Sequence, residues 1–220
     1  NNMTDAKKTL DIQIISDNIC PFCYLGKKKI EAAVATLGPD VKVNYDWRPF
    51  QLDPTLPTES VNKIERYKKK FGADRVGPML DQMKANGRPY GIEFSYGGNI
   101  GNTVNSHRLV DWSKQPSQGG GQHTDALINK LFNAYFEREA DIASLDTLAD
   151  IGSSVLPASR EEVMAFLKSD QLRDHVLSQM EDARNADVSG VPHFIIDGKY
   201  SVSGAQEPQT FQAIFKKLGY

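Results

Sequence analysis

Cys20-Pro21-Phe22-Cys23 is the stretch that decides the fold of this chain, because of what stands on either side of it. The residues before it, Leu10-Asp11-Ile12-Gln13-Ile14-Ile15, alternate well enough for a strand. After it, a helical i, i+3, i+4, i+7 spacing is formed by Ile30, Ala33, Val34 and Leu37. Pro21 suits the first turn of that helix, where its missing N–H costs nothing. The sequence therefore predicts a strand, a tight turn with both cysteines, and a helix.

Cys-x-x-Cys at a turn from strand to helix is typical of a thiol–disulfide exchange site. Cys20 would stand at the helix N-terminus, where unpaired N–H groups and the helix dipole favour an anion. We therefore expect Cys20 to be the attacking thiolate and to be partly exposed. Cys23, one turn further on, is expected to be the more buried, resolving thiol.

Three other roles for the cysteine pair are weaker. A structural zinc site needs about four ligands, and the four histidines form no second close pair: His107, His123, His175 and His193. No metal is therefore predicted. A structural disulfide would normally close a longer loop than this four-residue ring. Two inert buried thiols are the remaining alternative.

A second informative stretch, Ser189-Gly190-Val191-Pro192-His193-Phe194-Ile195-Ile196, is followed by Asp197-Gly198 and another apolar run. Two such runs joined by Asp-Gly predict a β-hairpin. Pro192 would begin the first strand, where a residue that cannot donate to the sheet is tolerated.

An early C-P-x-C and a late G-V-P-x-F hairpin together resemble the thioredoxin superfamily. More specific landmarks resemble the FrnE-type branch of DsbA-like oxidoreductases, which is related to 2-hydroxychromene-2-carboxylate isomerases and kappa-class glutathione transferases. They are Ser16-Asp17, Tyr24-Leu25-Gly26, Asn102-Thr103, His107-Arg108-Leu109, Ser189-Gly190-Val191-Pro192 and Ser203-Gly204-Ala205-Gln206. The resemblance implies a cis Val191–Pro192 bond beside the cysteines. The main chain of Val191 could then pair with an extended substrate.

The expected fold class is α/β: a thioredoxin fold with a large all-helical domain inserted between the second strand and the cis-proline hairpin. Val41–Trp47 reads as the second strand, and prolines soon after it end regular structure. Helical stripes follow, among them Val61, Ile64, Lys68 and Phe71, and a capping box at Ser159 and Glu162. The predicted divisions are 9–57 and 188–220 for the thioredoxin-like domain and 58–187 for the insert.

The composition fits a folded domain without an electrostatic reason to bind nucleic acid or an anionic membrane. Net charge is −2 and the pI is about 6.1. The runs Lys27-Lys28-Lys29 and Lys68-Lys69-Lys70 are expected to be solvated helix faces. The sequence contains no apolar run of membrane-spanning length, and the first eight residues lack the apolar core of a secretory signal. We expect a cytoplasmic protein, where a cysteine pair is more often catalytic than structural.

The candidate catalytic residues are Cys20, Cys23 and Pro192. Substrate binding is assigned to Val191, Pro21, Phe22, His107 and Asn102, although Asn102 could equally cap a helix. Relatives in the wider superfamily carry a buried acid six residues before the first cysteine. That position is Ile14 here, and the nearest acid is Asp17.

The predicted activity is thiol–disulfide oxidoreduction with protein or small-molecule thiols and disulfides. No cofactor is required, and glutathione is a possible redox partner. One alternative is a glutathione-dependent isomerase or transferase, which would not need Cys23. The other is a redox-sensing, client-binding module resembling a chaperone. The direction of electron flow, the substrate and the oligomeric state do not follow from the sequence.

Overall fold

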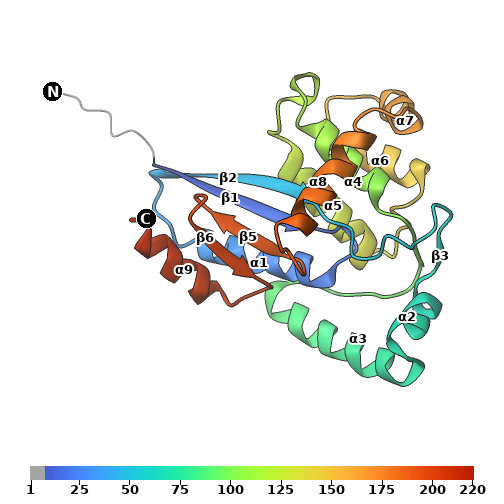
Figure 1. Ribbon diagram of the computed structural model, residues 1–220, viewed down its shortest axis with the longest axis horizontal. Helices are drawn as coiled ribbons and strands as arrows, with labels where there is room; N and C mark the ends of the chain where they lie inside the picture. The colour runs from blue at the N-terminus through green and yellow to red at the C-terminus, as the bar shows by residue number, and fades with distance from the viewer. Residues whose placement is uncertain (1–7) are drawn as a thin grey trace.

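Strand β1 (Lys8–Ser16) lies inside a four-stranded sheet of order β2-β1-β5-β6 (Figure 1). It pairs in parallel with β2 (Val41–Pro49) and antiparallel with β5 (His193–Ile196). Strand β6 (Tyr200–Ser203) completes the predicted hairpin. This computed structural model describes residues 8–220. The prediction that the first eight residues lack a secretory signal therefore falls almost entirely outside the described residues.

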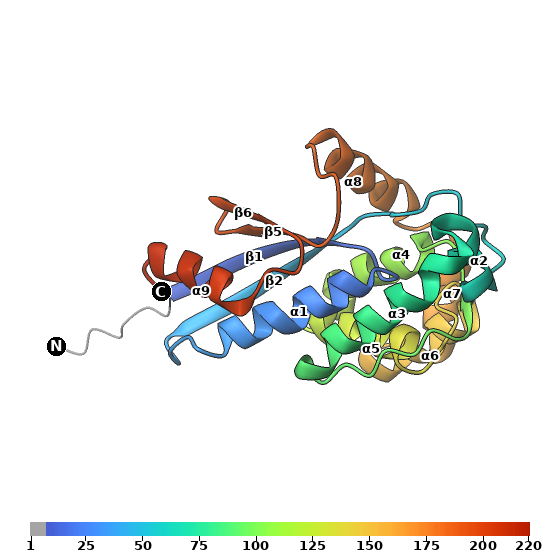
Figure 2. The ribbon, with the colours of Figure 1, turned by 90° about the horizontal axis from the view of Figure 1, so that it is seen from below.

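Helix α1 (Pro21–Val34) and helix α9 (Pro208–Lys217) cover one face of the sheet, and α8 (Arg173–Asn185) lies on the other (Figure 2). The alternation in β1 follows from these two layers. Leu10, Ile12 and Ile14 belong to the main core, whereas Ile15 packs in a separate cluster with Phe50, Ala183 and Val188. The apolar residues of β1 are thus buried on both faces of the sheet, whereas Asp11 is exposed.

The chain between β2 and β5 is mainly helical, which confirms the predicted fold class. Its helices are α2 (Lys63–Phe71), α3 (Ala73–Gly87), α4 (Val104–Ser113), α5 (Thr124–Phe136), α6 (Leu145–Val155), α7 (Arg160–Lys168) and α8, with 3₁₀ turns at Arg88–Tyr90 and Pro116–Gln118. The segment also holds a two-stranded ribbon, β3 (Val61–Asn62) with β4 (Asn99–Ile100). Val61, expected on a helix, belongs to this ribbon because the Asn62 side chain caps α2 by accepting the Glu65 N–H at 3.0 Å.

The insert and the sheet share one apolar core. The ring of Tyr24 in α1 stacks on Phe132 and Phe136 of α5, with centroids 5.1 and 5.9 Å apart. From β2, the indole Nε1–H of Trp47 donates to Asp125 of α5 at 3.1 Å. The domain boundaries at 57/58 and 187/188 stay predictions. Buried side chains of the thioredoxin-like part and of the insert belong to one cluster.

Two of the three lysines in the first basic run are buried, so the expectation of a solvated face is wrong there. Lys27 is 1% exposed and pairs with Glu31 and with Asp125. Lys29 is 8% exposed and pairs with Glu207 at 2.6 Å. These side chains meet carboxylates on neighbouring elements, which compensates for their removal from water. The second run, Lys68–Lys70, is exposed as expected.

The local turn and cap signals in the sequence are confirmed. Asp197 and Gly198 have φ of 49° and 65°, the positive values that a two-residue hairpin turn requires. Ser159 and Glu162 form the reciprocal capping box at the start of α7. Among residues 8–220, none of the helices combines the length and apolar character that a membrane crossing requires.

Gly26 allows α1 to approach the hairpin closely. A Cβ there would lie 2.9 Å from Cγ of Pro192 and 3.3 Å from Cζ of Phe194. We expect Gly26→Ala to lower the free energy of unfolding by about 1–3 kcal/mol, because overpacking outweighs the better helix propensity of alanine. Chemical denaturation measures this change.

Gly77→Ala is the matched control, because Gly77 is also helical and a Cβ there would meet nothing within 4 Å. Its free energy of unfolding should rise by up to about 1 kcal/mol. Equal changes in the two variants would contradict the close packing of Gly26 on Pro192.

Candidate functional site

Cys20 is the N-cap residue of α1, with extended backbone (φ −91°, ψ 114°), and Pro21 occupies the first helical turn as predicted. The Cys20 N–H donates to the carbonyl of Asp17 at 3.1 Å, and its carbonyl accepts the Cys23 N–H at 3.0 Å. The turn is therefore held at both ends by main-chain hydrogen bonds. Both thiols are free.

Both cysteines are buried. Cys20 is 3% exposed and Cys23 1%, so the expectation that Cys20 is partly exposed is wrong. The carbonyl oxygen of Val191 lies 3.7 Å from the Cys20 sulfur and accepts from its thiol, which covers one side of it. The sulfur instead lies at the base of a cleft, which a substrate would have to enter.

The thiol of Cys23 has an unfavourable environment for ionisation. Burial raises its pKa well above the ordinary value, and the neighbouring Cys20 thiol raises it further. The Ser16 hydroxyl and the main chain of Asp17 act in the opposite direction without reversing the rise. Cys23 is therefore protonated at neutral pH and must lose a proton before it can attack a disulfide.

The loop that precedes the hairpin contacts the cysteine turn, although Cys20 and Val191 are 171 residues apart in the sequence. The Val191–Pro192 bond is cis, which confirms that prediction. Val191 presents its carbonyl to Cys20, and the ring of Pro192 packs over Gly26, one turn of α1 beyond Cys23. The candidate residues Cys20, Cys23, Val191 and Pro192 are thus brought together.

An apolar cleft of about 450 Å³ opens above Cys20. Its walls come from the cysteine turn, the loop at 52–53, helices α2 and α3, and the loop at 190–191. Six large apolar side chains among residues 8–220 are exposed, and four of them line this cleft: Phe22, Leu52, Phe71 and Met79. Of the predicted substrate-binding residues, Pro21, Phe22 and Val191 lie in its wall.

Polar residues lie both at the edge of the cleft and in its inner wall. At its edge, Arg66 pairs with Asp53 at 2.7 Å, and Lys70 lies 3.8 Å from the same carboxylate. In its inner wall lie Tyr67 and Tyr96, both neutral at physiological pH because burial raises their pKa values, that of Tyr67 to about 12. Nothing in the helical pattern of this segment indicated that it would form a cleft wall.

A buried ammonium lies in the same part of the insert. Lys63 is fully buried, and its Nζ lies 3.8 Å from the centroid of the Tyr135 ring. Burial lowers its pKa to about 8. The sequence gives no sign of this, because Lys63 belongs to a segment rich in exposed lysines.

The two remaining candidates for substrate binding, Asn102 and His107, lie outside the cleft lining, and so does His193. Asn102 precedes Thr103, the N-cap residue of α4, and its Oδ1 accepts the N–H of the first helical residue, Val104, at 2.9 Å. His193 lies beside Ser203, with Nδ1 and Oγ 3.2 Å apart. His107 is buried in α4 and its Nε2 lies 3.0 Å from Oδ1 of Asp17.

Asp17 is the buried acid closest in sequence to the cysteines. It is 0% exposed, and its Oδ2 accepts the Leu52 N–H at 2.9 Å while Oδ1 faces His107. Ile14, at the position where the superfamily carries its acid, is an apolar core residue. The sequence singled out Asp17 and His107 separately, and their contact across 90 residues required the fold.

A strand–helix cysteine turn beside a cis proline, with helices inserted into the sheet domain, defines a DsbA-like thioredoxin domain. The chain belongs to the DSBA-like thioredoxin domain family, whose model matches residues 11–216. It is 25% identical to the Bacillus subtilis (strain 168) protein YwbO, itself described as uncharacterized, over 93% of this chain and 94% of that one.

Solved structures show the same similarity. A probable DsbA oxidoreductase from Streptomyces coelicolor, SCO1869, superposes with a TM-score of 0.83 at 25% identity, covering 94% of this chain and 89% of that chain. A 2-hydroxychromene-2-carboxylate isomerase superposes with a TM-score of 0.67 at 17% identity, covering 94% and 95%. The second match shows a shared fold only.

The two thiols should differ in reactivity. At about pH 6 we expect iodoacetamide to label Cys20 at least about tenfold faster than Cys23, because Cys20 lies at a helix N-terminus and lines the cleft. The raised pKa of Cys23 keeps it protonated there. Mass spectrometry of the reduced protein after timed labelling measures both rates.

The Cys20→Ser variant is the control, because it leaves Cys23 alone. Its labelling should be slow and should increase only at alkaline pH. Equal labelling of the two cysteines at about pH 6 would contradict the assignment of Cys20 as the attacking thiol.

Proposed function

We propose that this chain is a dithiol–disulfide oxidoreductase of the FrnE type, in which Cys20 reacts with substrate and Cys23 resolves the intermediate. One observation supports it most: two free thiols in unequal environments, Cys20 at the base of an apolar cleft and Cys23 behind it with a raised pKa. A two-step exchange requires such a difference, because one thiol must react with the substrate first and the other must react only with the mixed disulfide.

In the reductive direction, the thiolate of Cys20 attacks a substrate disulfide RS–SR. A Cys20–SR bond forms, the RS–SR bond breaks, and one RS⁻ leaves with the electron pair. Cys23 then loses its proton and attacks the Cys20 sulfur, forming the Cys20–Cys23 disulfide and releasing the second RS⁻. The substrate gains two electrons and the protein loses two.

In the oxidative direction, a substrate thiolate attacks Cys20 of the Cys20–Cys23 disulfide, and Cys23 leaves as a thiolate and takes up a proton. A second substrate thiol then attacks the mixed disulfide at the substrate sulfur, which releases Cys20. Burial of Cys23 favours its protonated form, so this departure ends in a stable thiol.

The cleft supports thiol or disulfide substrates with an apolar flank, either protein segments or small molecules. Its exposed apolar residues Phe22, Leu52, Phe71 and Met79 surround the approach to Cys20. An extended segment could lie along Val191, whose main chain contacts Cys20. We propose a cytoplasmic enzyme that needs no cofactor and that uses glutathione as a redox partner.

Replacement of Cys23 separates this function from a glutathione-dependent isomerase or transferase, in which one thiol suffices. We expect Cys23→Ser to abolish turnover of insulin disulfides and to accumulate mixed disulfides at Cys20, because no internal thiol can displace the substrate. Turbidity during insulin reduction measures turnover, and mass spectrometry detects the adduct.

Cys20→Ser is the matched control and should be inactive without forming any adduct. Retention of most activity by Cys23→Ser would favour the isomerase or transferase class. Client binding that survives loss of both thiols, without turnover in the wild type, would favour the chaperone-like alternative.

The cleft assignment is tested by placing a charge in its apolar wall. Met79→Lys should raise KM for a peptide disulfide with an apolar flank by about fivefold to tenfold, with little change in kcat, because the apolar flank loses a contact worth roughly 1 kcal/mol. Leu177→Lys changes a similarly exposed apolar residue on α8 and should leave KM unchanged. Equal KM values for the two variants would place the substrate elsewhere.

A further inference from the structure

The resolving step creates a proton inside the protein. Cys23 is 1% exposed and its pKa is raised, so the proton that it releases has no direct contact with solvent. Ile14 occupies the position from which an acid would serve this thiol in relatives, and it is an apolar core residue. Another group must take the proton if the step is to be fast at neutral pH.

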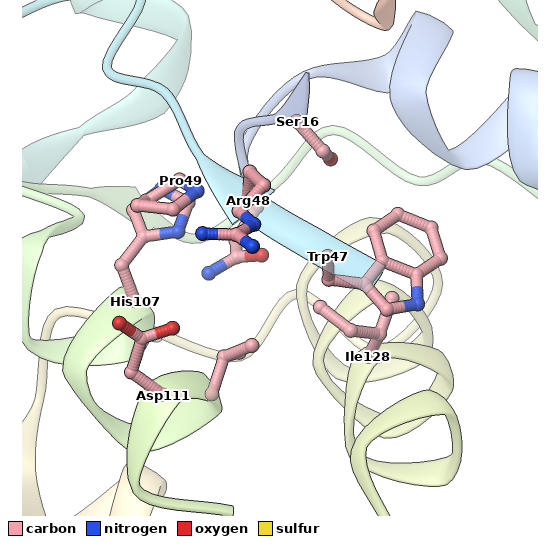
Figure 3. A pocket seen from close by; sticks show the side chains of 9 residues that line it. Ser16, Trp47, Arg48, Pro49, His107, Asp111 and Ile128 are labelled. Carbon is pink, nitrogen blue, oxygen red and sulfur yellow. The ribbon is translucent and has the colours of Figure 1, made fainter. Parts of the chain in front are cut away.

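A small cavity lies between Ser16 and the imidazole of His107 (Figure 3). Its volume is about 10 Å³, the lower limit for one water molecule. Ser16 borders it from the end of β1, and His107 and Asp111 border it from α4, while Trp47 and Ile128 form an apolar side. A water here would meet several polar groups, which is the condition for a buried water to be stable.

Ser16 connects this cavity with the thiol. Its hydroxyl acts on the Cys23 sulfur in the direction that lowers the thiol pKa. The same oxygen is buried and has no well-aligned hydrogen-bond partner among residues 8–220. It can therefore accept from the thiol and donate to a water in the cavity, which a serine hydroxyl allows at one atom.

His107 is the imidazole that borders the cavity. Its Nε2–H donates to the carboxylate of Asp17 at 3.0 Å, which leaves Nδ1 as the basic nitrogen. Asp17 is held in turn by the Leu52 N–H, so the imidazole is fixed in one orientation.

Other titratable groups around the imidazole are already engaged. Asp111 accepts from Gln179 at 2.6 Å and pairs with Lys114 at 3.1 Å, while His175 of α8 lies 3.5 Å from it. From β2, Arg48 lines the cavity and pairs with Asp46. From α5, Tyr135 faces Asp17, and burial keeps its pKa well above the ordinary value.

We propose that the proton of Cys23 passes through Ser16 and a water in this cavity to His107, which Asp17 positions. In the reductive direction the Cys23 S–H bond breaks as its sulfur attacks Cys20, RS⁻ leaves from Cys20, and the proton ends on Nδ1 of His107. In the oxidative direction the proton returns to Cys23 as its thiolate leaves. The inference rests on the proposed function, because it describes the resolving step of that exchange.

The experiment follows release of 5-thio-2-nitrobenzoate when the reduced protein reacts with excess 5,5′-dithiobis(2-nitrobenzoate). The first release reports attack by Cys20, and the second reports attack by Cys23 on the mixed disulfide. We expect His107→Gln to slow the second release about tenfold to a hundredfold near pH 7 and to leave the first unchanged. At strongly alkaline pH, where hydroxide removes the proton, the variant and the wild type should converge.

Ser16→Ala and the double variant test the path itself. Ser16→Ala should slow the second release near pH 7, and the double variant should be no slower than the slower single variant, since both interrupt one path. His175→Gln is the control, because His175 approaches Asp111 from the exposed side, and its rate–pH curve should match the wild type. Circular dichroism confirms that each variant is folded.

Three results would overturn the relay. The first is a rate of second release in His107→Gln that equals the wild-type rate at every pH. The second is a rate in His107→Gln that is lowered by the same factor at every pH. The third is a rate–pH curve that shifts to alkaline pH in Asp111→Asn and not in His107→Gln. In each case both releases still occur and the proposed function stands. If neither release occurs in the wild type, the proposed function fails, and the relay fails with it.

Discussion

The contact between the Cys20 sulfur and the Val191 carbonyl, 3.7 Å apart, joins the two halves of the site. Strand β1 places both partners. It leads into the cysteine turn, and it pairs with β5, which directly follows the loop that contains Val191. Antiparallel pairing of β1 with β5 sets Ile15 opposite His193, so the two loops emerge at the same edge. The sheet register therefore decides which main-chain atoms face the thiols.

Burial of the pair then determines its chemistry. A thiol removed from water resists ionisation, and this affects Cys23 because it lies one helical turn deeper than the N-terminal residue Cys20. Most of the exposed large apolar side chains among residues 8–220 lie around the cleft that contains Cys20, and Cys23 is not part of its lining. Burial thus gives the two thiols different surroundings, although they stand only one helical turn apart.

Much of this arrangement could be predicted from local sequence. The cysteine turn, Pro21 at the first helical turn, the Asp197-Gly198 hairpin and the capping box at Ser159 depend on nearby residues, and the structure confirms them. The predictions that Cys20 is partly exposed and that Lys27 is solvated were wrong. Both properties depend on partners distant in sequence, Val191 for Cys20 and Asp125 for Lys27. Burial is set by tertiary packing, and periodicity reports only which face a residue occupies.

The same reasoning explains why the cleft and the small cavity lay beyond sequence analysis. Phe71 and Met79 are apolar residues of α2 and α3, and the structure leaves them exposed in the wall of the cleft. Asp17 and His107 lie 90 residues apart, and nothing in either segment indicates that the two side chains meet. The insert contributes to both: α2 and α3 form a wall of the cleft beside Cys20, while α4 brings His107 and Asp111 to the small cavity beside Ser16. Different helices of the inserted segment therefore line the cleft and the small cavity, so a change in one helix can alter one lining and leave the other unchanged.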